Sequence, residues 1–76
     1  MRISDLQSKS VINVIDGKEI GNIIDISIDE NGFTKELIVE KYKFLISSFS
    51  SKKEIIIKWS DVEKIGEDVI FVRVVN

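Results

Sequence analysis

Asp25, Ser27 and Asp29 are the polar side chains whose spacing is most suggestive of chemistry. They alternate with isoleucines, so on a β-strand they share one face. Two carboxylates on one face could hold a cation or work as an acid and base pair. Along a strand, however, Asp25 and Asp29 stand about 13 Å apart, too far to share one ion without other ligands. We therefore expect a solvated face or turn caps, and no metal site.

The rest of the composition argues against catalysis. The 76 residues include no histidine and no cysteine. An imidazole base, a thiol nucleophile, the usual zinc ligands and disulfides are therefore excluded. The sequence also has no glycine-rich phosphate loop. We expect a protein that is not an enzyme and that needs no cofactor.

A basic and aromatic cluster is the second candidate site. It consists of Lys41, Lys43, Lys52 and Lys53 interleaved with Tyr42, Phe44 and Phe49. Small barrels bind RNA by stacking bases on aromatic rings beside a cationic groove. The net charge of −2 gives no general attraction for nucleic acid. We favour a solvated loop whose aromatic residues pack into the domain or against a protein partner.

The elements that carry these residues are short and rich in β-branched side chains. Ile and Val, which favour strands, dominate the apolar residues, and the chain has no Ala and few Leu, the residues typical of helical bundles. Turn signals separate the apolar segments. The predicted strands are Ser10 to Ile15, Ile20 to Asp29, Phe33 to Tyr42, 43–49, Glu54 to Trp59, and Asp68 to Val75. This spacing predicts a small all-β domain.

Two short helical turns are expected between the strands. Ser4 to Gln7 and Ser60 to Glu63 both match a capping box, in which a Ser at the N-cap is followed three residues later by Gln or Glu. Each is too short to be stable alone, so Leu6 and Val62 should pin them to the sheet. Gly17 should adopt a positive φ in a tight turn, and Gly21 should mark a bend or bulge.

The alternation within the strands predicts the core. Ile24, Ile26 and Ile28 share one face, as do Ile55, Ile57 and Trp59, and as do Ile70, Val72 and Val74. Four apolar residues fall opposite these faces: Ile23, Ile56, Val69 and Phe71. A last strand that is apolar on both sides is a candidate surface for self-association. We therefore predict an interaction surface at Val69 and Phe71, together with Tyr42, Phe44 and Phe49.

The pattern resembles a known family. Asp16 to Ile23, Asp25 to Asp29, Gly32 and Leu37 to Val39 look like the first half of a PRC-barrel domain. Three further stretches resemble the YlmC/YmxH family of stand-alone PRC-barrel proteins: Met1 to Gln7 with Val11 to Asn13, Trp59-Ser60, and Lys64 to Ile70. The stretch from Tyr42 to Ser51, with Lys58 before Trp59, departs from the Gly-rich segment and Pro of that family.

The resemblance implies one domain over residues 1–76, a small six-stranded β-barrel, closed on itself so that no Ile-rich edge is exposed. It also implies a non-catalytic protein-interaction module with a sporulation-associated role, which we expect to act as a homodimer. The alternative is an RNA- or ribosome-associated barrel, similar to the C-terminal barrel of a ribosome maturation factor. No apolar run is long enough to cross a membrane, and Met1 to Asp5 lacks a signal-peptide core. We expect a cytoplasmic protein.

Overall fold

The computed structural model describes residues 2–42 and 53–75. Two of the predicted site residues, Phe44 and Phe49, lie outside the described residues, as does the short strand predicted at 43–49.

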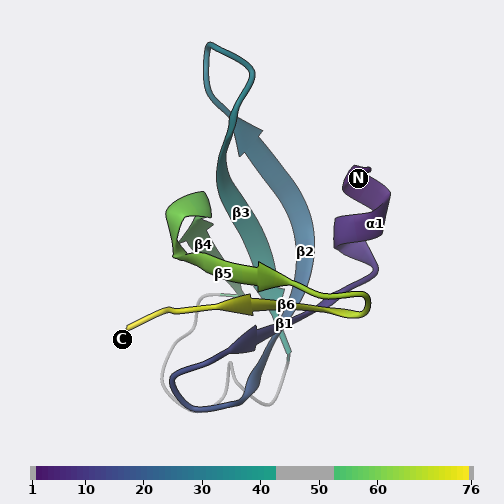
Figure 1. Ribbon diagram of the computed structural model, residues 1–76, viewed down its shortest axis with the longest axis vertical. Helices are drawn as coiled ribbons and strands as arrows, with labels where there is room; N and C mark the ends of the chain where they lie inside the picture. Colours follow the sequence, from purple (N-terminus) through teal and green to yellow (C-terminus); the bar gives the residue numbers. More distant parts are fainter. Residues whose placement is uncertain (1, 43–52, 76) are drawn as a thin grey trace.

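The described residues form a short helix and a curled six-stranded sheet (Figure 1). In chain order the elements are α1 (Ile3–Gln7), β1 (Ser10–Asn13), β2 (Glu19–Ile28), β3 (Thr34–Lys41), β4 (Glu54–Lys58), the 3₁₀ helix η1 (Trp59–Asp61), β5 (Val62–Ile65) and β6 (Val69–Val72). The strand order is β4-β3-β2-β1-β6-β5. All neighbours are antiparallel except β1 and β6, which are parallel. The predicted all-β class is confirmed.

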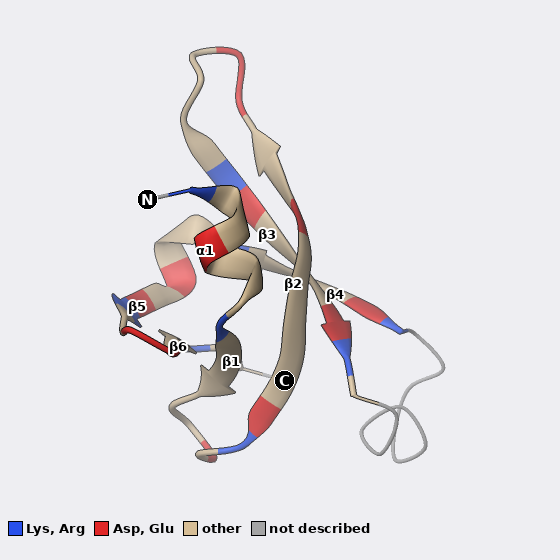
Figure 2. Ribbon diagram, turned by 90° about the vertical axis from the view of Figure 1, so that its right-hand side faces the viewer, with Lys and Arg blue, Asp and Glu red and all other residues tan. Residues whose placement is uncertain are grey.

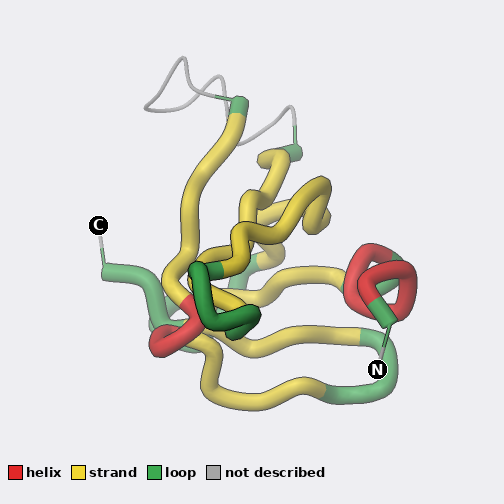
Figure 3. The backbone as a smooth tube through the Cα atoms, turned by 90° about the horizontal axis from the view of Figure 1, so that it is seen from above, coloured by secondary structure: helices red, strands yellow, loops and turns green. Residues whose placement is uncertain are grey.

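The sheet is not a closed ring. It curls around a common interior (Figure 3), but β4 and β5 stand at the two ends of the strand order and do not pair with each other. The expectation of full closure is therefore wrong. Within the described part of the chain, each of these two strands has one edge that pairs with no other strand.

Three strands differ from the prediction. β1 and β6 are shorter than the predicted strands Ser10 to Ile15 and Asp68 to Val75, and β5 occupies a segment that was expected to be helical. The segment from Ser60 to Glu63, expected as a capped helical turn, is divided between the end of η1 and the start of β5. The predicted cap at Ser60 is wrong, because η1 has Lys58 at its N-cap and no side-chain cap. Val62 instead pairs with Val72 in β6. Pairing with β6, the next strand along the chain, has overridden the local capping signal.

The first helical turn is present, with a different cap. α1 begins after Arg2, whose backbone N–H donates to Asp5 Oδ2 at 2.8 Å. The capping box predicted from Ser4 and Gln7 is therefore wrong. The prediction that Leu6 anchors the turn is confirmed, because Leu6 is buried and α1 packs beside β2 (Figure 2).

β2 breaks the simple alternation of a strand. Its pairing shifts register opposite β1 between Val11 and Ile12, and opposite β3 between Ile23 and Asp25. Each shift is a bulge, which adds a residue and changes which face the following side chains occupy. As a result, the inward-facing isoleucines are Ile20, Ile23 and Ile26.

This phase change corrects the predicted core of β2. Ile24 and Ile28 are exposed, and of the predicted face only Ile26 packs against the core. Ile23, predicted to face outward, is buried. The bulge at Gly21 was anticipated, but its effect on the phase of the isoleucines was not.

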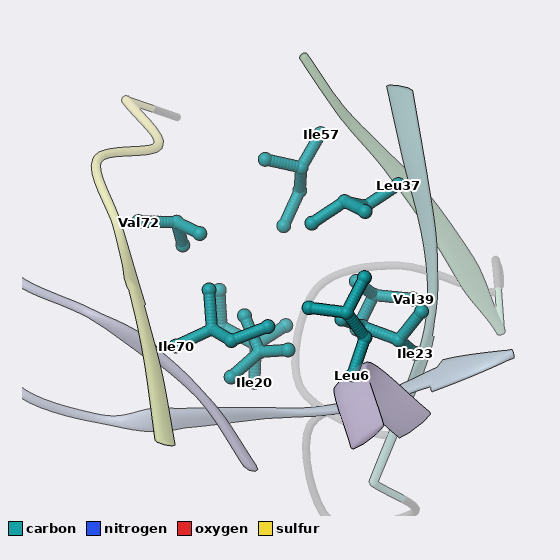
Figure 4. Packing of buried hydrophobic residues seen from close by; sticks show 9 residues of the cluster. Leu6, Ile20, Ile23, Leu37, Val39, Ile57, Ile70 and Val72 are labelled. Atoms are coloured by element: carbon teal, nitrogen blue, oxygen red, sulfur yellow. The ribbon is translucent and has the colours of Figure 1, made fainter. Parts of the chain in front are cut away.

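The core itself is wholly aliphatic (Figure 4). Its buried members come from α1 and from all strands except β5: Leu6, Val11, Ile20, Ile23, Leu37, Val39, Ile57, Ile70 and Val72. Trp59 and Ile55 are half-buried and pack against this cluster, as the shared face of β4 predicted. Gly17 has a φ of 71°, which confirms the tight turn after β1.

Candidate interaction surface

Val69 and Phe71 lie on the face of β6 opposite the core residues Ile70 and Val72, and both are half-buried. Register places Phe71 between Ile12 of β1 and Lys64 of β5. Ile12 is also half-buried. The outer face of β1 and β6 thus carries a small apolar surface, which we call the β6 face, made of Ile12, Val69 and Phe71.

β6 presents only this face to a partner. It pairs with β1 on one side and with β5 on the other. Backbone groups within a ladder are already hydrogen-bonded, so strand exchange at β6 would break two ladders. A partner at β6 would therefore make side-chain contacts.

Tyr42 lies elsewhere in the sheet. It directly follows β3 and is half-buried, and its backbone N–H donates to the carbonyl oxygen of Ile20 at 3.2 Å. β2 and β1 separate β3 from β6 in the strand order. In the sheet, Tyr42 is therefore not a neighbour of the β6 face.

The two aspartates have local backbone partners. Asp29 Oδ1 accepts hydrogen bonds from the backbone N–H groups of Asn31 at 2.9 Å and Phe33 at 3.0 Å, so Asp29 caps the turn between β2 and β3. Asp25 Oδ1 accepts from the N–H of Ile26 at 2.8 Å. Within residues 2–42 and 53–75, no three acidic side chains are grouped as a metal site would require.

A second apolar surface lies on the opposite half of the sheet. The outer side of β2, β3 and β4 carries Ile24, Ile38 and Ile56, and register places Ile38 directly beside Ile56. Ile56 is 61% exposed. The alternation of β4 predicted an outward Ile56, and this is confirmed. Ile24 was missed because a bulge turns it outward.

The hairpin between β2 and β3 carries a third group of exposed apolar side chains. Its tip projects beyond the rest of the sheet (Figure 1), with Ile28 and Phe33 exposed. Part of this tip consists of acidic residues, drawn in red in Figure 2. Sequence reasoning missed Ile28, because it was assigned to the core.

In the described part of the chain, no helix is long and apolar enough to cross a membrane.

Comparison with known proteins agrees with this fold. The PRC-barrel domain matches residues 1–76. The chain is 40% identical over 72 residues to the probable sporulation protein YlmC of Bacillus subtilis, with 93% of this chain and 89% of the relative covered. It is also 34% identical over 71 residues to an uncharacterized protein of Clostridium acetobutylicum, covering 93% of this chain and 82% of that protein.

The curled six-stranded sheet, the match over residues 1–76 and the similarity to YlmC agree with one another. The chain belongs to the PRC-barrel domain family.

Proposed function

We propose that this PRC-barrel domain is a non-catalytic protein-interaction module. The observation that carries the proposal is the β6 face, where the half-buried apolar side chains of Ile12, Val69 and Phe71 adjoin on the outer side of β1 and β6. Among the described residues the exposed large hydrophobic side chains are Ile3, Ile15, Ile24, Ile28, Phe33, Ile56 and Val75. Single exposed apolar residues are ordinary, but apolar residues that adjoin on one face are typical of protein contacts.

The proposed surface for a protein partner is the β6 face, with Tyr42 at the end of β3 as a further contact. Phe71 is the anchor, because aromatic side chains contribute most to protein interfaces. The name of the Bacillus relative suggests that the module acts in sporulation, and we propose that it does so in the cytoplasm. Homodimerisation is part of the proposal.

The RNA-binding alternative has less support. Lys41 and Lys53 do lie side by side, since the N–H of Lys41 donates to the carbonyl oxygen of Lys53 at 2.7 Å. The hollow beside them, about 640 Å³, is also lined by Glu54, Ile55 and Ile56. A carboxylate in the groove disfavours a phosphate backbone, and none of the described residues that line it is aromatic.

Replacing Phe71 tests the proposal. The chain with Phe71→Ser and the matched control with Ile28→Ser, each tagged, are used to capture proteins from sporulating cells, and captured proteins are quantified by mass spectrometry. Phe71→Ser should reduce a specific set of captured proteins by tenfold or more, because loss of a buried anchor costs about 2 kcal/mol or more. Ile28→Ser should retain them.

Circular dichroism and thermal melting of both variants check that the sheet remains folded. If wild type, Phe71→Ser and Ile28→Ser capture the same proteins in the same amounts, the β6 face is not the contact surface.

A further inference from the structure

β4 is a regular strand with a free edge. It lies at one end of the strand order and, among residues 2–42 and 53–75, pairs with β3 alone. Its ladder with β3 runs from Glu36–Lys58 to Glu40–Glu54 without a register shift. A bulge-free, Ile-rich edge is a template for another strand.

The direction of its backbone groups follows from the ladder. The N–H of Lys41 donates to the carbonyl of Lys53, so that pair is a hydrogen-bonded one. Hydrogen-bonded and non-hydrogen-bonded pairs alternate along an antiparallel ladder. Ile55 and Ile57 therefore bond to β3, while the backbone N–H and C=O groups of Glu54 and Ile56 and the N–H of Lys58 point to the free edge. The carbonyl of Lys58 also begins η1, because Lys58 is its N-cap.

The other end of the sheet is protected. β5 has a register shift between Val62 and Lys64, and Glu63 forms an ion pair with Arg73. A bulge and charged side chains are the usual means by which an edge strand avoids pairing. In β4 the charged residues stand only at the two ends of the strand, on either side of three isoleucines.

The order of side chains in β4 is self-complementary. The strand reads Glu-Ile-Ile-Ile-Lys from Glu54 to Lys58. Two antiparallel copies centred on Ile56 place each Glu54 opposite the Lys58 of the other copy. A shift of two residues would place Glu54 opposite Ile56, and a parallel in-register arrangement would place like charges together. Only the antiparallel, Ile56-centred register matches both charge and hydrogen bonding.

We propose that the free edge of β4 binds the same edge of a second copy of this chain, in an antiparallel ladder with a two-fold axis at Ile56. Glu54, Ile56 and Lys58 then exchange backbone hydrogen bonds with the second copy. The exposed Ile56 packs against its own equivalent, and the apolar row of Ile24, Ile38 and Ile56 continues across the axis. On the core side, this register places the half-buried Ile55 opposite the Ile57 of the other copy, which is already buried in its own core. The proposal assigns homodimerisation to a surface other than the β6 face.

Charge reversal at the strand ends tests this register by sedimentation velocity over a range of protein concentrations. Glu54→Lys and Lys58→Glu each turn both cross-strand ion pairs into like-charge pairs, so each should weaken self-association by about tenfold. The double variant Glu54→Lys/Lys58→Glu should recover the wild-type affinity. An equimolar mixture of the two single variants should form a heterodimer. Lys35→Glu, an exposed strand position away from the edge, is the matched control and should change nothing.

Ile56→Pro gives a second, independent readout. The N–H of Ile56 points away from β3, so proline removes the donor of the free edge and leaves the ladder to β3 in place. It should abolish the dimer while thermal melting still shows a folded domain.

Three results would overturn the proposal. They are a wild-type chain that stays monomeric at high concentration, single variants that dimerise like wild type, and a double variant that fails to recover. If Phe71→Ser alone abolishes self-association, the dimer forms through the β6 face, which overturns the β4 interface and leaves the protein-binding function standing. If the single variants instead lose a captured unrelated protein while the wild-type chain is a monomer, the edge binds a foreign strand and the second-copy assignment is wrong.

Discussion

At the scale of single residues, Asn13 is the polar side chain most tightly held in the described structure. It is 5% exposed, and both polar atoms of its amide form hydrogen bonds: Nδ2 donates to the carbonyl of Val74 at 2.9 Å, and Oδ1 accepts from the N–H groups of Ile15 and Val74 at 3.2 Å each. The Asn13 side chain thereby gives Val74 the backbone hydrogen bonds that a neighbouring strand would otherwise provide, and it holds the segment after β6 against the sheet.

Asn13→Ala should lower the free energy of unfolding by about 2 kcal/mol, because the backbone groups of Val74 would lose their partner in a part-buried place. Urea denaturation followed by fluorescence of Trp59 measures the loss. Asn22→Ala, on the exposed side of β2, serves as the control and should change stability by less than about 0.5 kcal/mol. Equal stability of the Asn13 variant and wild type would show that water replaces the amide.

The role of Asn13 could not be predicted from the sequence. Its main partner, Val74, is 61 positions away along the chain, and only the parallel pairing of β1 with β6 brings the two together. By contrast, Asp29 as a turn cap could be predicted, since its partners are two and four residues away and short polar side chains bond to nearby backbone.

At the scale of elements, β2 shows why the presence of a strand could be predicted from the sequence, whereas the face on which each of its isoleucines lies could not. Local composition identifies an Ile-rich strand from about residue 20. The phase depends on two bulges, which arise from pairing with β1 and β3. A bulge is a property of two strands, so alternation within one of them placed Ile24 in the core and Ile23 outside, the reverse of what the structure shows. Ile28 follows Ile26 on the same face but is exposed, because it lies at the hairpin tip that projects beyond the rest of the sheet.

Gly21 is the residue that permits the close crossing of β2 and β3. A Cβ atom at this position would lie 1.9 Å from the carbonyl oxygen of Glu40. Gly21→Ala should therefore destabilise the domain by about 3 kcal/mol, since backbone must move to accept the methyl group.

Thermal melting compares this variant with Gly66→Ala, whose Cβ would lie 3.3 Å from atoms of Val69. The Gly66 variant should lose less stability than the Gly21 variant. Equal melting temperatures for Gly21→Ala and wild type would mean that the strands separate at no cost.

At the scale of the whole molecule, the aliphatic composition is the feature on which the proposed interaction role depends. A 76-residue chain with so many aliphatic side chains fills its small interior and still leaves isoleucines on two outer faces and along one open edge. The fold class and the outward position of Ile56 could be predicted from alternation. The open edge could not, because closure depends on whether β4 and β5 meet.

The hydrogen exchange of the β4 backbone, read residue by residue by NMR at low and high protein concentration, tests the central claim most directly. The amides of Ile55 and Ile57 bond to β3 and should be protected at both concentrations. The amides of Glu54, Ile56 and Lys58 should exchange quickly in dilute protein and become protected as the concentration rises, because the second copy then accepts their hydrogen bonds. Exchange at Ile56 that stays fast at every concentration would contradict the account.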